Sequence, residues 1–162
     1  MTVVSTRKDT EALTLEFVTE FDAPVERVWQ VWEDPRQLER WWGPPGWPAT
    51  FEQFDFAPGG DVGYYMTGPD GTRAHGWWRM VAVEPPHRIE LVDGFANEDG
   101  THNDEYGTSS MVATLEPHGD GTRMRIVSTF ESVDQLDKML AMGMEEGMKL
   151  ALGQIDDLLV TV

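Results

Sequence analysis

The sequence contains no cysteine, and this absence excludes several kinds of chemistry at once. Disulfides, thiolate nucleophiles, iron–sulfur clusters and cysteine-ligated zinc all require that side chain. Residues 1–8 lack the apolar core of a secretory signal. No run approaches the roughly 20 apolar residues that span a bilayer. We therefore expect a cytoplasmic protein that has neither a bound metal nor another cofactor.

Basic residues are also scarce. Only 12 lysines and arginines stand against 29 aspartates and glutamates, which gives a formal net charge of −17. Nucleic acids attract proteins mainly through lysine and arginine contacts with phosphates, and an acidic surface repels them. Anionic membrane surfaces are excluded for the same reason. We expect an acidic protein that binds neither nucleic acid nor membranes.

Aromatic residues and methionine, by contrast, are plentiful. The 162 residues include seven Trp, seven Phe and nine Met, which is ample material for the core of one domain. Methionine is flexible and fills irregular apolar spaces, so core packing is the ordinary use of each one taken singly. Together with the tryptophans, the methionines also suit the wall of an apolar ligand pocket.

The hydrophobic pattern predicts strands over most of the chain. Residues 13–21 alternate apolar and polar side chains, which is typical of a half-buried strand. Two short helices follow; Asp34 can cap the second, with Gln37 at the capping-box position. From residue 50 to residue 130 the pattern predicts six strands separated by short turns. Such neighbours pair antiparallel.

The last segment has helical periodicity. Ser132 and Gln135 form a capping box, and apolar residues then recur at helical spacing to residue 159. Gly143 and Gly147 are four residues apart on one face, which favours a close passage of this helix against the sheet; a homodimer contact is the alternative. We expect an N-terminal tail over residues 1–12 and a single domain over residues 13–160.

Several short motifs occur in order along the chain. They are Phe21-Asp22-Ala23-Pro24-Val25-Glu26-Arg27-Val28-Trp29, Trp41-Trp42-Gly43-Pro44, Pro58-Gly59-Gly60, Pro69-Asp70-Gly71, Glu84-Pro85-Pro86 and Gly147-Met148-Lys149-Leu150-Ala151-Leu152-Gly153-Gln154-Ile155. In this order they resemble the Hsp90-ATPase-activator-homologue-like (AHSA1-like) family of the START/Bet v 1-like, or SRPBCC, superfamily. The resemblance implies an α+β helix-grip fold: a curved seven-stranded antiparallel sheet around a long C-terminal helix, with two short helices after the first strand and an interior cavity.

Two positions depart from the family pattern. Ala57 stands where an arginine commonly precedes the Pro-Gly-Gly motif, and Met148 stands where a tryptophan commonly follows the glycine of the terminal helix. Both positions would alter a cavity or its rim, so a relative's ligand is not carried over to this chain.

Candidate catalytic groups are few, because no phosphate loop, dinucleotide fingerprint or nucleophile motif is present. Asp93 has the same strand parity as Leu91, which favours an inward carboxylate whose pKa an apolar cavity would raise. The alternative is that Asp93 only ends its strand before Gly94. His75 lies within a predicted strand and is the second weak candidate. His102 belongs to an acidic loop, which is either a site for a hard cation or simply solvated.

The leading hypothesis is a binding domain for a small hydrophobic molecule in the interior cavity. The residues predicted to line it are Trp41, Trp42, Tyr64, Met66, Trp78, Leu91, Phe95, Met111, Met144 and Met148. Which of Trp77 and Trp78 faces inward is left open by the pattern. A cyclase- or dehydratase-like enzyme acting on an apolar substrate is the second hypothesis, and a chaperone-interacting stress-response protein is the third.

Overall fold

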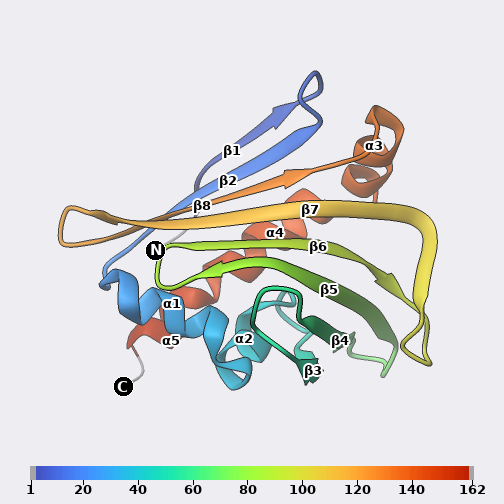
Figure 1. The fold of residues 1–162 in the computed structure, drawn as a ribbon, viewed down its shortest axis with the longest axis horizontal. Helices are drawn as coiled ribbons and strands as arrows, with labels where there is room; N and C mark the ends of the chain where they lie inside the picture. The colour runs from blue at the N-terminus through green and yellow to red at the C-terminus, as the bar shows by residue number, and fades with distance from the viewer. Residues whose placement is uncertain (1–2, 161–162) are drawn as a thin grey trace.

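A computed structural model describes residues 3–160, in which eight strands form one antiparallel sheet in the order β1-β2-β8-β7-β6-β5-β4-β3 (Figure 1). The strands are β1 (Val3–Asp9), β2 (Thr14–Phe21), β3 (Ala49–Phe54), β4 (Asp61–Thr67), β5 (Arg73–Glu84), β6 (Arg88–Ala96), β7 (His102–His118) and β8 (Gly121–Thr129). Every neighbouring pair is antiparallel. The α+β helix-grip class expected from the sequence is confirmed.

The helices of the described residues lie in two groups along the chain. They are α1 (Val25–Glu33), α2 (Pro35–Trp41), α3 (Val133–Ala141), α4 (Met144–Gly153) and α5 (Ile155–Val160). Figure 1 shows α4 running behind β6 and β7, with α1, α2 and α5 gathered below the sheet. The helix α2 begins as predicted, because the Asp34 carboxylate accepts a hydrogen bond from the Arg36 amide at 3.0 Å. None of these helices is long and apolar enough to cross a membrane.

We expected residues 1–12 to be an N-terminal tail outside the domain. Residues 3–9 instead form β1, an edge strand of the sheet. This strand pairs with β2 from Val3 opposite Thr19 to Asp9 opposite Thr14, so the sheet has eight strands rather than seven within the described residues. The turn between the two strands is held by the Asp9 carboxylate, which accepts hydrogen bonds from two backbone amides at 3.0 Å. Residues 5–9 are mostly polar, as suits an edge strand, and so they lack the alternation that predicts strands.

The terminal helix predicted as one element is divided into α3, α4 and α5. Gly143 has a φ of 87°, a left-handed conformation that ends one helical segment and starts the next. Ser132 caps α3 as predicted, accepting from the Gln135 amide at 3.1 Å, but the Gln135 side chain accepts from the Glu131 amide at 2.6 Å. A Cβ at Gly143 or at Gly147 would meet no atom within 4 Å, so the expected close passage of this face against the sheet is wrong.

Two side chains anchor the terminal helices at the end near α1 and α2. The Arg27 guanidinium donates to the carbonyl of Leu158 at 2.6 Å and to the side chain of Gln37 at 2.9 Å. The Gln154 amide donates to the carbonyl of Gly43 at 2.6 Å. These bonds fix α4 and α5 at one end of the sheet, while α3 and the start of α4 lie over the other end.

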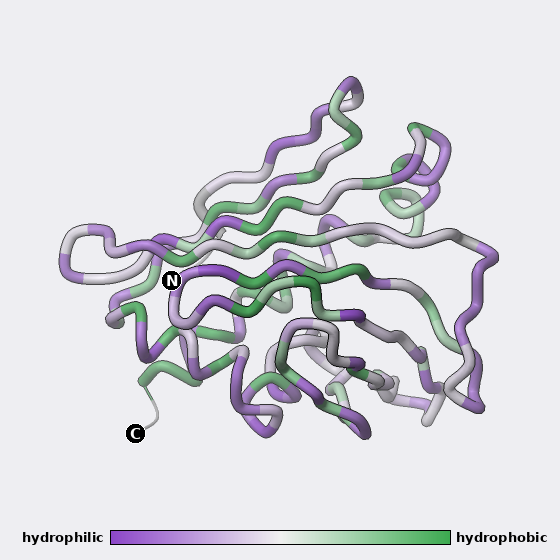
Figure 2. Tube along the Cα trace, viewed as in Figure 1, coloured by the Kyte–Doolittle hydropathy of each residue, from purple (hydrophilic) through white to green (hydrophobic). Residues whose placement is uncertain are grey.

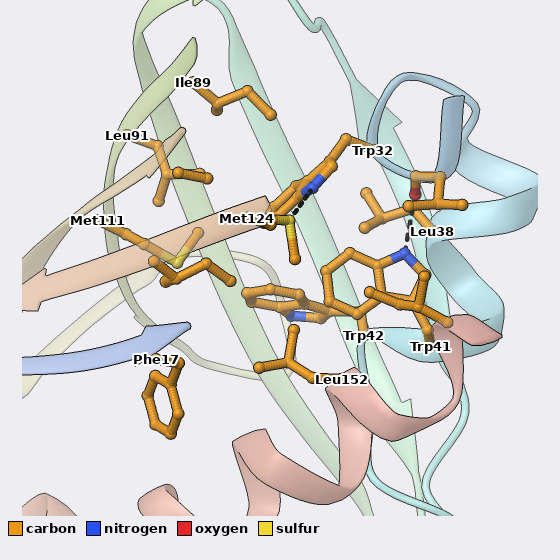
Figure 3. Packing of buried hydrophobic residues seen from close by; sticks show 14 of the residues in the cluster. Phe17, Trp32, Leu38, Trp41, Trp42, Ile89, Leu91, Met111, Met124 and Leu152 are labelled. Atoms are coloured by element: carbon orange, nitrogen blue, oxygen red, sulfur yellow. Dashed lines mark hydrogen bonds between the residues drawn. The ribbon is translucent and has the colours of Figure 1, made fainter. Parts of the chain in front are cut away.

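The core lies at the anchored end and is built around tryptophans (Figure 3). Trp32 and Trp41 are fully buried and meet edge to face at 4.9 Å between ring centroids. The Trp41 indole donates to the carbonyl of Val31 at 2.8 Å, and the Trp32 indole donates to the Met124 sulfur at 3.3 Å. Figure 2 shows hydrophobic residues along the middle of the central strands and hydrophilic residues in the turns. The indole N–H groups of Trp32 and Trp41 are thus paired while their rings pack.

We expect the substitution Gly71→Ala to destabilise the protein by about 1 kcal/mol. Gly71 has a φ of 86° in the turn between β4 and β5, as the Asp70-Gly71 pair predicted, and its left-handed backbone disfavours any Cβ. Urea denaturation measures the loss as a lower midpoint. Gly147→Ala is the matched control, because Gly147 is inside α4 with open space at its Cβ position, and there alanine should raise the midpoint. Equal shifts in the two variants would contradict the assignment.

Candidate ligand cavity

A cavity of about 340 Å³ lies between the inner face of β4–β7 and the segment formed by α3 and the start of α4. Its lining consists of Tyr64, Met66, Ala74, His75, Asp93, Gly94, Phe95, Gly107, Ser109, Phe130, Gln135, Met139, Met142, Gly143, Met144 and Met148. The volume is within the range of about 300–1,000 Å³ that small-molecule sites occupy. Methionines and aromatic rings predominate among these side chains, and the cavity is partly open to solvent.

Irregularities in β7 and in the terminal helix create this space. The partner of β6 jumps from Thr108, opposite Gly94, to Asn103, opposite Phe95, so β7 turns a corner there (Figure 1). The corner is tied to the start of α3, since Gln135 donates to the carbonyl of Thr108 at 2.9 Å and Glu131 accepts from its amide at 2.7 Å. The break at the α3–α4 junction changes the direction of the chain opposite this corner. Strand and helix therefore separate at the end of the molecule opposite the tryptophan core.

Asp93 places a carboxyl group in the cavity. It lies on β6, opposite Trp78 of β5 and Ser109 of β7, on the same face as Leu91, as its parity predicted. Protein encloses this carboxyl except where it meets the cavity, and this burial raises its pKa to about 6. The Ser109 hydroxyl donates a hydrogen bond to Asp93 Oδ1, which offsets only part of the burial effect.

Tyr64 brings a phenol close to this carboxyl. Its ring crosses Gly76 on the neighbouring strand, where a Cβ would lie 2.5 Å from the phenol oxygen. Burial, and then the negative charge of Asp93, raise the pKa of Tyr64 above its usual range. The indoles of Trp42 and Trp78 act in the opposite direction, although neither buried N–H reaches hydrogen-bonding geometry with an acceptor in the described part of the chain. Tyr64 is therefore a neutral hydroxyl near Asp93.

Five of the ten predicted lining residues are in the cavity wall, and so is one of the two weak catalytic candidates. The wall contains Tyr64, Met66, Phe95, Met144 and Met148, together with Asp93. His75 borders the same space, but its ring lies beside that of Tyr65 on the outer face of the sheet. The other five are corrections: Trp41, Trp42, Trp78, Leu91 and Met111 are buried in the core and do not line the cavity. On the strands, parity identified inward side chains, but it could not separate the packed end of the inner face from the open end.

The sequence interpretation missed other wall residues that carried a usable signal. Ser109 has the same parity as Met111, so its inward position could have been predicted from alternation. Met139 and Met142 belong to the methionine-rich terminal segment, but their position depends on the break at Gly143. Gln135 was identified only as a capping residue.

The outer face of the sheet resolves the choice between the two adjacent tryptophans. Trp78 is fully buried, while Trp77 lies on the opposite face over Gly94 and stacks on His102 at 3.8 Å between ring centroids. In the same loop the Asp99 carboxylate accepts from the Thr101 amide at 3.0 Å. Across residues 3–160, no group of three or more His, Cys, Asp or Glu side chains is arranged to hold a metal ion.

Comparisons with known proteins agree with this architecture. The family described as Activator of Hsp90 ATPase homolog 1-like protein matches residues 22–160. A protein from Arthrobacter aurescens, solved by NMR, is 59% identical, with 98% of this chain and 92% of that chain covered and a TM-score of 0.94. A Mycobacterium smegmatis protein is 46% identical, with coverages of 99% and 98% and a TM-score of 0.91. No curated protein matches the sequence.

Proposed function

The chain belongs to the family of Activator of Hsp90 ATPase homolog 1-like proteins, and from this premise we propose that it binds a small, mainly apolar molecule in the cytoplasm. The single observation that carries the proposal is the cavity of about 340 Å³ between β4–β7 and the α3–α4 segment. Its wall combines flexible apolar side chains with a few polar groups, which is the usual composition of a small-molecule site.

The four methionines of the helical wall support binding rather than packing. Met139, Met142, Met144 and Met148 all border the cavity. Unbranched thioether side chains adapt to ligands of different shape at little conformational cost. Met142 is 56% exposed, so it lies at the mouth, where a side chain can move aside as a ligand enters.

An enzyme acting on an apolar substrate is the second candidate, and Asp93 is the observation that favours it. A carboxyl with a pKa near 6 can accept or donate a proton near neutral pH, and the neutral Tyr64 hydroxyl can stabilise a developing negative charge nearby. Turnover that is lost in Asp93→Asn while ligand affinity is retained would separate catalysis from binding. A chaperone contact remains a prediction from the family resemblance alone.

We expect a neutral apolar fluorophore, N-phenylnaphthylamine, to bind the native protein with a rise in fluorescence. Met148→Trp should weaken this binding about tenfold or more, because an indole in place of the thioether takes up cavity space, at a cost typical of overpacking. Leu150→Trp is the matched control, since Leu150 is on the same helix, is 48% exposed and does not border the cavity. Fluorescence titration of the three proteins measures the effect.

Two outcomes would count against a ligand carrier. One is the absence of fluorophore binding to a protein that native circular dichroism shows to be folded. The other is equal weakening by Met148→Trp and Leu150→Trp, which would place the bound probe outside the cavity. Native mass spectrometry of protein purified from its own host is the independent measurement, because a co-purified ligand would be identified by its mass.

A further inference from the structure

The cavity is bordered by a negative charge without a positive charge to balance it. Asp93 supplies a carboxylate, and no lysine or arginine is among the described residues that border the cavity. Two arginines of β5 are engaged outside it, Arg79 with Asp61 and Arg73 over the ring of Tyr65 at 4.3 Å from its centroid. An ionised carboxylate in an apolar enclosure is unfavourable unless an opposite charge or several hydrogen bonds compensate it.

The hydrogen bonding of Asp93 is also incomplete. Its donors among the described residues are the Ser109 hydroxyl, at Oδ1, and its own backbone amide, fewer than the roughly four hydrogen bonds that an ionised carboxylate can accept. A carboxylate oxygen facing a cavity in this state can accept a strong hydrogen bond from a ligand donor. The rings of Tyr64, Phe95 and Phe130 border the same space, and aromatic faces attract cations.

We propose that the ligand is an amphiphile with one protonated amine, whose ammonium group binds Asp93 while its apolar body lies along the methionine wall. This inference rests on the proposed binding function and names the chemical class of the ligand. A carboxylate ligand is disfavoured because it would place like charges together, within a protein whose formal net charge is −17. A neutral alcohol can bind, but it leaves the charge of Asp93 uncompensated.

A matched series of three probes tests the proposal: phenylbutylamine, phenylbutanol and phenylbutyrate, which are similar in shape and differ in charge. Near pH 7 we expect calorimetry to show that the amine binds roughly tenfold or more tightly than the alcohol, from the usual strength of charge-assisted hydrogen bonds. The carboxylate should bind most weakly. Asp93→Asn should abolish the preference for the amine and leave the affinity for the alcohol nearly unchanged.

General attraction of cations to an acidic surface needs its own control. Glu116→Gln removes one exposed carboxylate from β7, the strand that carries Ser109, and should leave the amine preference intact. High salt screens surface attraction strongly and a buried pair much less. A preference that disappears equally in Glu116→Gln and in Asp93→Asn would overturn the proposal.

The pH dependence of amine affinity in the natural protein tests the same idea without the Asp93→Asn variant, and so it remains available if that variant folds poorly. Amine affinity should rise with pH through about 6 as Asp93 ionises, and Ser109→Ala should move this midpoint upward by removing a bond that favours the carboxylate. Within the described residues, the other titratable side chains near this end of the cavity are Tyr64 of β4, Glu131 near the β7 corner, and His75 of β5, whose ring lies beside Tyr65 on the outer face. His75→Gln should leave the midpoint in place.

The failures are distinguishable. Equal affinity for the amine and the alcohol, or an amine preference that persists in Asp93→Asn, would overturn the inference and leave the binding function standing. If neither the alcohol nor N-phenylnaphthylamine binds, the binding function itself fails. A midpoint that follows His75→Gln instead of Ser109→Ala would assign the pH dependence to the imidazole and overturn the role of Asp93.

Discussion

Replacement of Trp41 by alanine is expected to lower the free energy of unfolding by about 3–5 kcal/mol, the usual cost of truncating a buried indole. Trp41 is fully buried, meets Trp32 and Trp42 edge to face, and donates its indole hydrogen bond to the carbonyl of Val31 at 2.8 Å. The variant loses these contacts and leaves the Val31 carbonyl without its indole donor. Denaturant unfolding with a two-state analysis measures the loss.

Met148→Ala is the matched comparison, because both residues were predicted from the sequence to line a ligand cavity. Met148 borders an existing cavity and is only partly buried, so its truncation removes less packed surface and should cost about 1 kcal/mol. For ligand affinity we expect the opposite order. Met148→Ala should change the binding of N-phenylnaphthylamine more than a core substitution does in a variant that still folds. A stability loss for Met148→Ala as large as that for Trp41→Ala would contradict the division between core and cavity.

Local patterns were enough to predict most strands, both helix caps and the inward direction of Asp93. These features depend on alternation within one strand or on residues three positions apart, so each is contained in a short piece of sequence. The turn at Gly71 belongs to the same class, because a left-handed glycine is required within four residues. The resemblance to the family supplied the order in which these elements assemble.

The position of the cavity depends instead on contacts between distant segments. The corner of β7 is fixed by the Thr108 amide, which donates to Glu131, and by the Thr108 carbonyl, which accepts from Gln135; both partners are more than 20 residues away. The separation of strand and helix also depends on the helix break at Gly143. Helical periodicity did not indicate this break, because apolar residues recur at helical spacing on both sides of it. The sequence pattern could therefore mark Trp41 and Met148 equally as apolar helix residues suited to a pocket wall, but it could not show that one is packed and the other borders a cavity.

Asp93→Asn is expected to change the pH dependence of stability. The pKa of Asp93 is about 6 in the folded protein and has its ordinary value of 3.8 in the unfolded chain, so the folded state binds the proton more tightly. The resulting stabilisation is complete below pH 3.8 and is lost as pH rises through 6. At neutral pH the ionised carboxylate thus destabilises the fold. Relative to the natural protein, Asp93→Asn should gain about 2–3 kcal/mol between about pH 4 and about pH 7.

The difference between the two unfolding free energies, measured across this pH range, isolates Asp93, because the other carboxylates contribute equally to both proteins. Asparagine keeps an oxygen that can accept from the Ser109 hydroxyl, so packing and hydrogen bonding change little. Glu116→Gln should give a flat difference. A flat difference for Asp93→Asn as well would mean that the carboxyl is solvated in the folded protein. It would then have no uncompensated charge to attract an ammonium group, and the preference for amines would lose its physical basis.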